Sequence, residues 1–300
     1  MILAADVGGT NIRAAVVTTQ GEITKELHSR IDLGDRNISE NDLIDRLAGF
    51  FAGIIKQQSS ISGIGIGFPG FFLGSSGVLV ASPNLPNLNG VNLAQHLSEA
   101  LNLPVSIQND ALCAAIGEQR FGAGRGLANL LHITLGTGIG GGLILNHTPY
   151  TGVSGMAMEF GHLSVEFDDS ARACGCGGNG CVEAYASASS ISERYFDACG
   201  TQTDSKDIYE QACNGDAVAK AIIESAGHYL GISIAQSIKL LDIHTVTISG
   251  GLSNAWPLLH PTMIRSLDEN LIHPLKGKIS VLKSTLDDHA GLLGAAALIS

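Results

Sequence analysis

A cluster of potential metal ligands lies between residues 162 and 181. His162 is followed by Cys174, Cys176 and Cys181, so three cysteines and several glycines share one short stretch. Three thiolates and one imidazole form a closed tetrahedral set for structural Zn²⁺. Glycines let such a loop bring all three sulfurs together. Two other interpretations stay open from the residues alone. One is a disulfide with a spare thiol, which needs an oxidising compartment; the other is a packed His162 with a different fourth ligand.

Carboxylates flank this cluster, and another stands upstream. Glu159 and Glu183 lie on either side of the cysteines, and Asp110 follows Asn109 at the start of a helical pattern. Such acids can cap a helix or pair with its dipole. Asp110 could instead be a general base that takes the proton of a hydroxyl attacking a γ-phosphoryl group. His162 could bind zinc with one nitrogen and offer its other N–H to a sugar oxygen. Uncharged and acidic acceptors around one base favour a sugar pocket.

Three glycine turns follow apolar strand patterns and could hold a polyphosphate. Their backbone N–H groups and the first turn's threonine hydroxyl can cradle phosphates, and Asp6 is placed for a Mg²⁺–phosphate. A plain hairpin explains the first turn alone equally well. Neither a Walker A loop nor a dinucleotide fingerprint is present. The turns are Asp6-Val-Gly8-Gly9-Thr10-Asn11, Gly136-Thr137-Gly138 and Gly250-Gly251, of which the last could admit a nucleobase or ribose.

Alternating strand and helix patterns must position these residues. Apolar runs predict strands at 2–7, 12–17, 22–29, 61–67, 105–107, 130–135, 140–145, 245–248 and 279–282. Helical spacing predicts helices at 40–57, 92–101, 109–120, 184–198, 206–213, 216–240, before 270 and from 288. The strand–glycine turn–strand unit occurs twice, which indicates an internal duplication. We therefore expect two α/β lobes with a cleft between them, one of 1–109 with 289–300 and one of 110–288.

Composition limits the class of protein. Hydrophobic residues make up 45% of the 300 residues, enough for a sizeable core, and the net charge is -11. That charge argues against a nucleic-acid or anionic-membrane surface. Asp6 interrupts the only early apolar run and no run is long enough to span a bilayer, so we expect a cytoplasmic protein without membrane contact. Cys113, Cys199 and Cys213 lie in helical patterns and are predicted to be small core residues.

Together the motifs resemble the ROK family (repressors, open reading frames and sugar kinases) over essentially the whole chain, in order. The residues that carry the resemblance are Asp6-x-Gly-Gly-Thr-x-x-Arg13, Gly65-x-Gly-x-Pro69-Gly70, Asn109-Asp110, Gly136-Thr137-Gly138-x-Gly-Gly, Glu159-x-Gly-His162, Cys174-x-Cys176-x4-Cys181-x-Glu183 and Gly250-Gly251. The resemblance implies a two-lobed actin-like, ribonuclease H-like α/β fold with a zinc loop, which closes on ATP and a hexose. It also implies a homodimer.

The resemblance assigns a role to each matching residue. It makes Asp110 the catalytic base and puts Asn84, Asn109, Glu159, His162 and Glu183 on sugar hydroxyls. It puts Asp6, Gly8, Gly9, Thr10, Asn11, Arg13, Gly136, Thr137 and Gly138 near phosphates and Mg²⁺, and Gly250 and Gly251 near adenosine. It makes His162, Cys174, Cys176 and Cys181 the zinc ligands.

The substrate that these roles imply is a hexose phosphorylated at its 6-hydroxyl. The zinc block and Asp288-His-Ala-Gly resemble glucokinases, although Asn87-Leu88 stands where many of them have Gly-Trp. N-acetylmannosamine kinase, N-acetylglucosamine kinase and fructokinase share the motifs and remain alternatives. A repressor would need a DNA-binding segment before the first strand, which begins here at residue 2, and the acidic charge opposes it. A sugar-sensing actin-like ATPase is the non-enzyme alternative, which the intact Asn109-Asp110 pair opposes.

Overall fold

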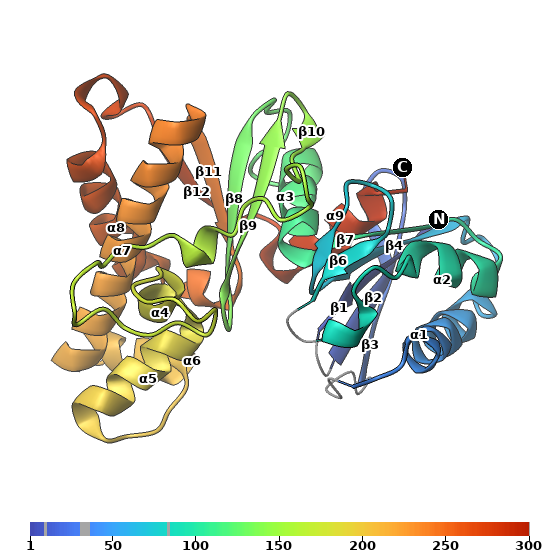
Figure 1. Cartoon of the computed structure of the whole chain (residues 1–300). Helices are drawn as coiled ribbons and strands as arrows, with labels where there is room; N and C mark the ends of the chain where they lie inside the picture. The colour runs from blue at the N-terminus through green and yellow to red at the C-terminus, as the bar shows by residue number, and fades with distance from the viewer. Residues whose placement is uncertain (9–10, 31–36, 83–84, 300) are drawn as a thin grey trace. The chain divides into compact units, whose positions relative to one another are not determined.

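The structure is a computed structural model that describes residues 1–8, 11–30, 37–82 and 85–299 (Figure 1). Two compact units divide the chain: Met1–Ala128, Gly142–Met158 and His289–Ser300 form the first, and Asn129–Gly141 and Glu159–Asp288 form the second. The sequence placed the boundary after residue 109. In the division into these two units, 110–128, 142–158 and the C-terminal segment from His289 belong to the first unit.

The first unit is built on a five-stranded sheet of order β3-β2-β1-β4-β7. The antiparallel strands are β1 (Ile2–Val7), β2 (Asn11–Val17) and β3 (Ile23–Arg30). Parallel to β1 run β4 (Gly63–Phe68) and β7 (Val105–Asn109), and a small hairpin adds β5 (Phe71–Phe72) and β6 (Leu79–Ala81). Because β1, β4 and β7 are parallel, Asp6, Gly67 and Asn109 all lie at the carboxyl edge of this sheet, where ligands of α/β folds bind.

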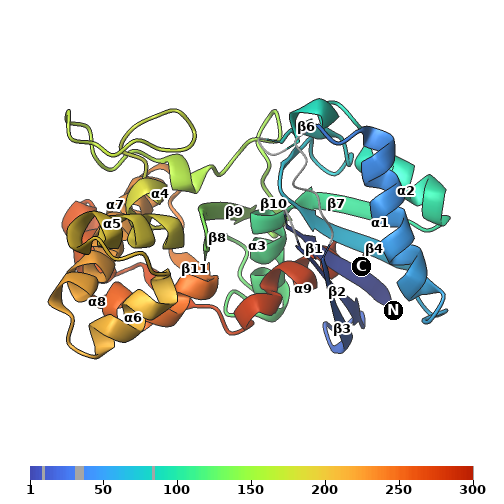
Figure 2. The same cartoon turned by 90° about the horizontal axis from the view of Figure 1, so that it is seen from below.

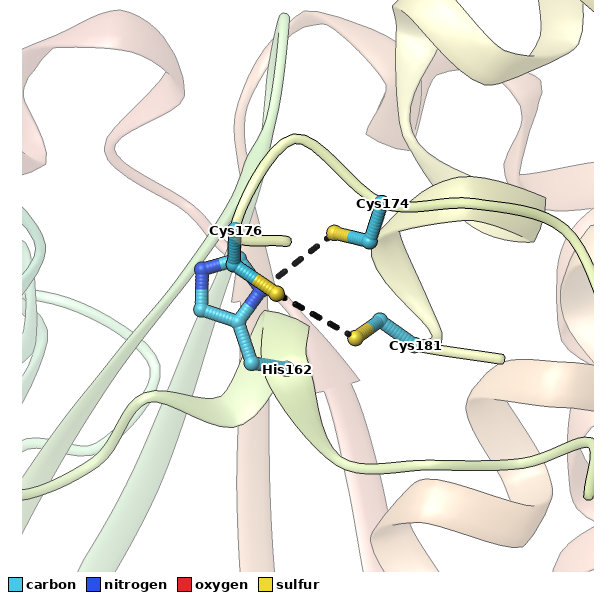
Figure 3. Close-up of side chains that lie close together, drawn as sticks. All are labelled: His162, Cys174, Cys176 and Cys181. Carbon is cyan, nitrogen blue, oxygen red and sulfur yellow. Dashed lines mark hydrogen bonds between the residues drawn. The ribbon is translucent and has the colours of Figure 1, made fainter. Parts of the chain in front are cut away.

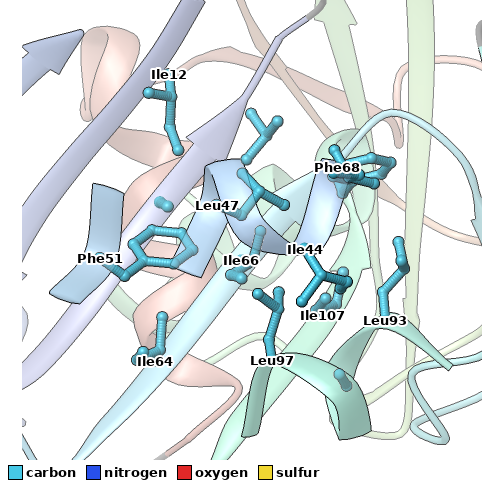
Figure 4. Packing of buried hydrophobic residues seen from close by; sticks show 14 of the residues in the cluster. Ile12, Ile44, Leu47, Phe51, Ile64, Ile66, Phe68, Leu93, Leu97 and Ile107 are labelled. Carbon is cyan, nitrogen blue, oxygen red and sulfur yellow. The ribbon is translucent and has the colours of Figure 1, made fainter. Parts of the chain in front are cut away.

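One face of this sheet is covered by two amphipathic helices. Helix α1 (Glu40–Ile55) has Ser39 as its N-cap and α2 (Leu93–Leu101) has Asn92. Alternate strand residues point toward them, as the strand period requires. Figure 4 shows this core, in which Leu47 and Phe51 of α1 pack with Ile64 and Ile66 of β4. Complete burial of these side chains fixes which face of the sheet the helices cover.

Two further helices pack on the sheet: α9 (Ala290–Ala297) lies against β1 and β4, and α3 (Asp110–Phe121) lies against β4 and β7. They approach each other closely because glycines stand at the contact. A Cβ on Gly294 would overlap the Cys113 carbonyl, and one on Gly117 would overlap the Ala290 carbonyl. This contact fixes α3 on the sheet, and α3 carries Asp110 as its first residue.

The second unit contains most of a sheet of order β10-β9-β8-β11-β12. Its strands are β8 (Leu130–Leu135), β9 (Ile139–Leu145), β10 (Thr148–Pro149), β11 (Thr245–Ser249) and β12 (Ser280–Lys283), of which β8, β11 and β12 are parallel. The chain leaves the second unit within β9, after Gly141. Helices α7 (Ala217–Leu241) and α8 (Trp256–Asn270) lie side by side (Figure 2), because Gly227 and Gly231 of α7 leave room for the α8 backbone.

The remaining helices follow the cysteine loop. The predicted helix at 184–198 is two helices, α4 (Glu183–Ala186) and α5 (Ala188–Cys199). Ser187 breaks it, since its backbone is extended and its hydroxyl accepts the Ser190 N–H as an N-cap. Helix α6 (Ser205–Cys213) completes the unit, and the other predicted helices and strands are confirmed within a few residues.

The three cysteines outside the ligand cluster differ in burial. Cys113 is fully buried as expected, but Cys199 and Cys213 are exposed at the ends of α5 and α6. Each is the last residue of its helix, where the chain turns outward.

Within the described residues, no helix combines the length and apolarity needed to cross a membrane.

Candidate active site

The four predicted metal ligands converge in the second unit. Their ligand atoms all lie within 4.8 Å of one another. Cys174 Sγ is 3.6 Å from His162 Nδ1, and the Sγ atoms of Cys176 and Cys181 are 3.7 Å apart (Figure 3). A disulfide needs an S–S distance of about 2.05 Å. Two sulfurs bound tetrahedrally to one Zn²⁺ at about 2.3 Å would lie roughly 3.8 Å apart. The donor set therefore fits zinc and not a disulfide.

Backbone turns of the cysteine loop hold this geometry. Gly177 adopts a positive φ of 90° and donates its N–H to the Cys174 carbonyl. Gly180 has a φ of 76° and lies against the Glu166 carbonyl, where a side chain would not fit. Burial raises the pKa of the Cys181 thiol to about 12, so a cation is needed to keep it a thiolate.

Glu159 and His162 form a pair beside the cluster. They lie at the ends of a 3₁₀ turn (Phe160–His162), with His162 Nε2 3.6 Å from Glu159 Oε2. His162 therefore presents Nδ1 to the sulfurs and Nε2 to a carboxylate, an arrangement that orients metal-bound imidazoles. Partial burial raises the pKa of Glu159, the nearby His162 opposes the rise, and the Glu183 carboxylate adds to it.

Glu183 opens α4, but its side chain reaches beyond its own helix. Its Oε2 accepts the Ile139 N–H at 2.7 Å, directly after the Gly136-Thr137-Gly138 turn. Its Oε1 lies 3.9 Å from Cys174 Sγ. The family resemblance assigns Glu183 to the sugar hydroxyls. It does not predict this hydrogen bond, which joins residues 44 positions apart.

A cavity of about 480 Å³ adjoins the same glycine turn. Its walls come from the turn, from the start of α5, from α6 and from the segment after β11. They are Gly136, Thr137, Ala188, Ser205, Lys206, Tyr209, Glu210, Gly251, Leu252, Asn254 and Ala255. Gly250 has a φ of 90° and lies against the Leu135 backbone, so the ends of β8 and β11 meet closely there. The two glycine turns thus open into one cavity, and its size suits a nucleoside.

Sequence reasoning missed the α6 wall of this cavity. Helix α6 buries Ile208 and Ala212, and its polar residues Lys206 and Glu210 line the cavity together with Tyr209. The amphipathic spacing of α6 is visible in the sequence, but the sequence does not show that α6 lies beside the glycine turns.

The first unit holds the other predicted residues. Asp6 ends up beside Asp110: a Cβ added to Gly67 would lie 3.7 Å from Asp6 Oδ1 and 3.6 Å from Asp110 Cα. Burial raises the pKa of Asp6, and the charge of Arg13 opposes the rise. Gly8 donates its N–H to the Asn11 carbonyl at 2.8 Å.

Asn109 and Asp110 begin α3, as predicted from the helical pattern. Asn109 is the N-cap: its Oδ1 accepts the Leu112 N–H at 3.0 Å, and its Nδ2 donates to the Gly70 carbonyl at 3.1 Å. Asp110 is exposed, and its Oδ1 accepts the Ala111 N–H at 2.8 Å. The predicted site residues Gly9, Thr10 and Asn84 lie outside the described residues.

Comparison with known proteins agrees with this geometry. A model of the ROK family matches residues 2–300. The glucokinase of Halalkalibacterium halodurans is 34% identical, with 98% of this chain and 93% of the relative aligned. The N-acetyl-D-glucosamine kinase of Histophilus somni is 30% identical, with 98% and 97% aligned.

A solved structure, the ROK family glucokinase from Streptomyces griseus in complex with glucose and AMPPNP, superimposes with a TM-score of 0.83. It is 30% identical, and the superposition covers 99% of this chain and 98% of that one. The predicted actin-like, ribonuclease H-like α/β fold class is thereby confirmed. The chain belongs to the ROK family.

Proposed function

We propose that the protein is an ATP-dependent hexose kinase that phosphorylates the 6-hydroxyl of its sugar, with glucose as the first candidate. Two kinds of relative support a sugar kinase, the glucokinases and the N-acetylhexosamine kinases. The cavity at the glycine turns of the second unit supports ATP as the phosphoryl donor, because it combines apolar walls for a base with backbone N–H groups for phosphates.

The observation that carries the proposal is the position of Asp110 beside Asp6. The two carboxyl-bearing residues flank Gly67 at the carboxyl edge of the first sheet. Phosphoryl transfer to a hydroxyl needs one carboxylate that accepts the hydroxyl proton and another that serves the Mg²⁺ bound to phosphate. Asp110 is exposed and suits the first role, and Asp6 is half-buried and suits the second.

The proposed reaction assigns a task to each group. Asp110 accepts the proton as the sugar oxygen forms its bond to the γ-phosphorus, and the bond from that phosphorus to the β,γ-bridging oxygen breaks. Mg²⁺, when bound, neutralises charge on the phosphates. Asn109 positions Asp110 by capping α3, and the N–H groups of Thr137 and Gly138 bind phosphate oxygens.

The ligand cluster has a structural part in this proposal. Zn²⁺ held by His162 and the three cysteines would fix the loop that carries Glu159 and Glu183, which we propose as ligands of the sugar hydroxyls together with Asn84 and Asn109. A closed set of four protein ligands leaves no open position for chemistry.

The test is ADP release measured with ATP, Mg²⁺ and a panel of sugars: glucose, N-acetylglucosamine, N-acetylmannosamine, fructose and mannose, with a sugar-free blank. ADP release that depends on glucose would support the full proposal. Preference for an N-acetylhexosamine would keep the kinase and replace its substrate. ADP release that is as fast in the blank as with every sugar would contradict a kinase and favour the ATPase alternative, whereas no release with any sugar would favour a sugar sensor or an untested substrate.

A homodimer and a cytoplasmic location complete the proposal. The family resemblance supports the dimer, and the use of ATP supports the location. Light scattering coupled to size-exclusion chromatography would give the mass of the particle in solution. A mass of one 31.1 kDa chain at micromolar concentration would contradict the dimer.

A further inference from the structure

The Glu183 carboxylate bridges two sites that the proposed function treats separately. One is the ligand cluster (His162, Cys174, Cys176 and Cys181), and the other is the phosphate loop (residues 136–139). We propose that Glu183 is a positioning residue through which the metal state of the ligand cluster sets the affinity of the phosphate loop for nucleotide. The inference rests on the proposed function insofar as the nucleotide is ATP.

The contact with the phosphate loop is direct. Glu183 Oε2 accepts the Ile139 N–H at 2.7 Å, and a Cβ on Gly138 would lie 2.5 Å from the same oxygen. A bond to an ionised acceptor is stronger than one between neutral groups. The carboxylate therefore fixes the end of the loop at which β9 begins.

The other end of the phosphate loop is held from the same helical segment. The Gly136 carbonyl accepts the Ala188 N–H at 2.9 Å, and the Gly136 N–H donates to the Gly138 carbonyl at 3.0 Å. Among the described residues, none accepts from the N–H groups of Thr137 and Gly138. Glu183 and Ala188 thus bracket the loop and leave two donors for an anion.

The Glu183 carboxylate also lies beside the ligand cluster. Cys181 precedes Glu183 by two residues, and the intervening Val182 donates its N–H to the carbonyl of Leu163, the neighbour of His162. The cluster ligands therefore flank the backbone that begins α4, and Glu183 Oε1 lies 3.9 Å from Cys174 Sγ. A metal that draws the four ligands together fixes the start of α4, and with it the Glu183 side chain.

The negative charge of Glu183 opposes the binding of a phosphate at the neighbouring loop. A carboxylate beside a phosphate loop repels the phosphate, by more in a half-buried site than in water. Removing it would strengthen nucleotide binding if the charge were all that mattered. The proposal predicts the opposite sign, because the order that the Ile139 bond gives the loop outweighs the repulsion.

The experiment measures binding of AMPPNP with Mg²⁺ by calorimetry, without sugar, in the full-length protein. We expect Glu183→Ala to weaken binding about tenfold and Glu183→Gln, which keeps an oxygen for the Ile139 N–H, to stay within about threefold of wild type. Glu224→Ala is the matched control: it removes a carboxylate of the same unit that pairs with Lys220 on α7 rather than with the cluster or the phosphate loop, and it should leave nucleotide binding unchanged.

Removing the metal from each variant tests whether Glu183 and the metal act through the same path. Stripping the metal with a chelator should weaken nucleotide binding in wild type and in Glu224→Ala, but should add little to the loss in Glu183→Ala. Hydrogen exchange gives a readout independent of affinity: the amides of 136–141 should exchange faster in Glu183→Ala, while those of β11 stay protected.

Wild-type nucleotide affinity in Glu183→Ala, or an equal effect of metal removal in both backgrounds, would overturn the inference. If Glu183→Ala is too unstable to measure, two measurements still test the inference: nucleotide binding by Glu183→Gln, and hydrogen exchange of the 136–141 amides in wild type stripped of metal. Unchanged exchange of these amides after metal removal would contradict the coupling. If wild type itself binds no nucleotide, the proposed function fails instead, and the exchange measurement separates the two failures.

Discussion

His132 should make the stability of the second unit depend on pH in a calculable way. It lies fully buried on β8, with Nδ1 2.8 Å from Thr247 Oγ1 and Nε2 3.0 Å from Ser249 Oγ, both on β11. Burial lowers the pKa of His132 from 6.5 to about 3. The neutral ring donates one hydrogen bond and accepts the other, so it joins the two strands that lead to the cavity at the glycine turns.

The sign and size of the effect follow from the two pKa values. Between pH 6.5 and pH 3 the unfolded chain binds a proton at this position and the folded chain does not, so the stabilising contribution is complete above pH 6.5 and falls with pH. Each pH unit below 6.5 costs about 1.4 kcal/mol. Lowering the pH from 7.5 to 4.5 should therefore remove roughly 2.7 kcal/mol through this one ring.

The assay is urea unfolding at pH 7.5, 6.5, 5.5 and 4.5, in wild type, His132→Gln and His244→Gln. His244 is exposed on the loop before β11 and serves as the control. We expect His132→Gln to be less stable at pH 7.5, but to lose roughly 2.7 kcal/mol less than wild type on acidification. His244→Gln should follow wild type. Parallel curves for wild type and His132→Gln would refute a neutral, buried His132.

Three further predictions concern the base, the metal and the first unit's core. Asp110→Asn should keep AMPPNP binding and lower kcat by about 10²- to 10⁴-fold in the ADP-release assay, and a loss under tenfold would remove Asp110 as the base. Cys176→Ser should lower both the zinc content, measured by mass spectrometry, and the melting temperature, and a full equivalent of zinc in the variant would contradict its role as a ligand. Gly294→Ala should destabilise the protein by about 2 kcal/mol or more in urea unfolding, because its Cβ would overlap the Cys113 carbonyl, whereas Gly53→Ala on the open side of α1 should be neutral or stabilising. Equal stability of these two glycine variants would mean that α3 and α9 can move apart freely.

Local sequence patterns predicted most of the fold, because strand and helix periods depend on near neighbours. The ligand cluster was also predictable, since three of its four ligands lie within one short loop and their chemistry limits the choice. The same reasoning located α3 from its helical spacing, and the structure shows Asn109 as its N-cap.

Contacts between distant segments could not be predicted in this way. The bond from Ile139 to Glu183, the α6 wall of the cavity and the place of α3 in the first unit all depend on packing between segments far apart in the sequence. The break at Ser187 was missed for a local reason: serine was counted within a helix, although its hydroxyl competes for backbone N–H groups.

The position of α9 has a consequence for the synthesis of the protein. Helix α9 packs on β1, β4 and α3, yet the 160 residues from 129 to 288 are translated before it. Gly65 of β4, which lies against the Ala295 backbone, is therefore synthesised long before the residues that cover it. During that time the first sheet exposes an apolar face, the kind of surface that chaperones cover and that aggregates when they are absent. Truncations that remove α9 should therefore yield insoluble protein, even though every proposed active-site residue is retained.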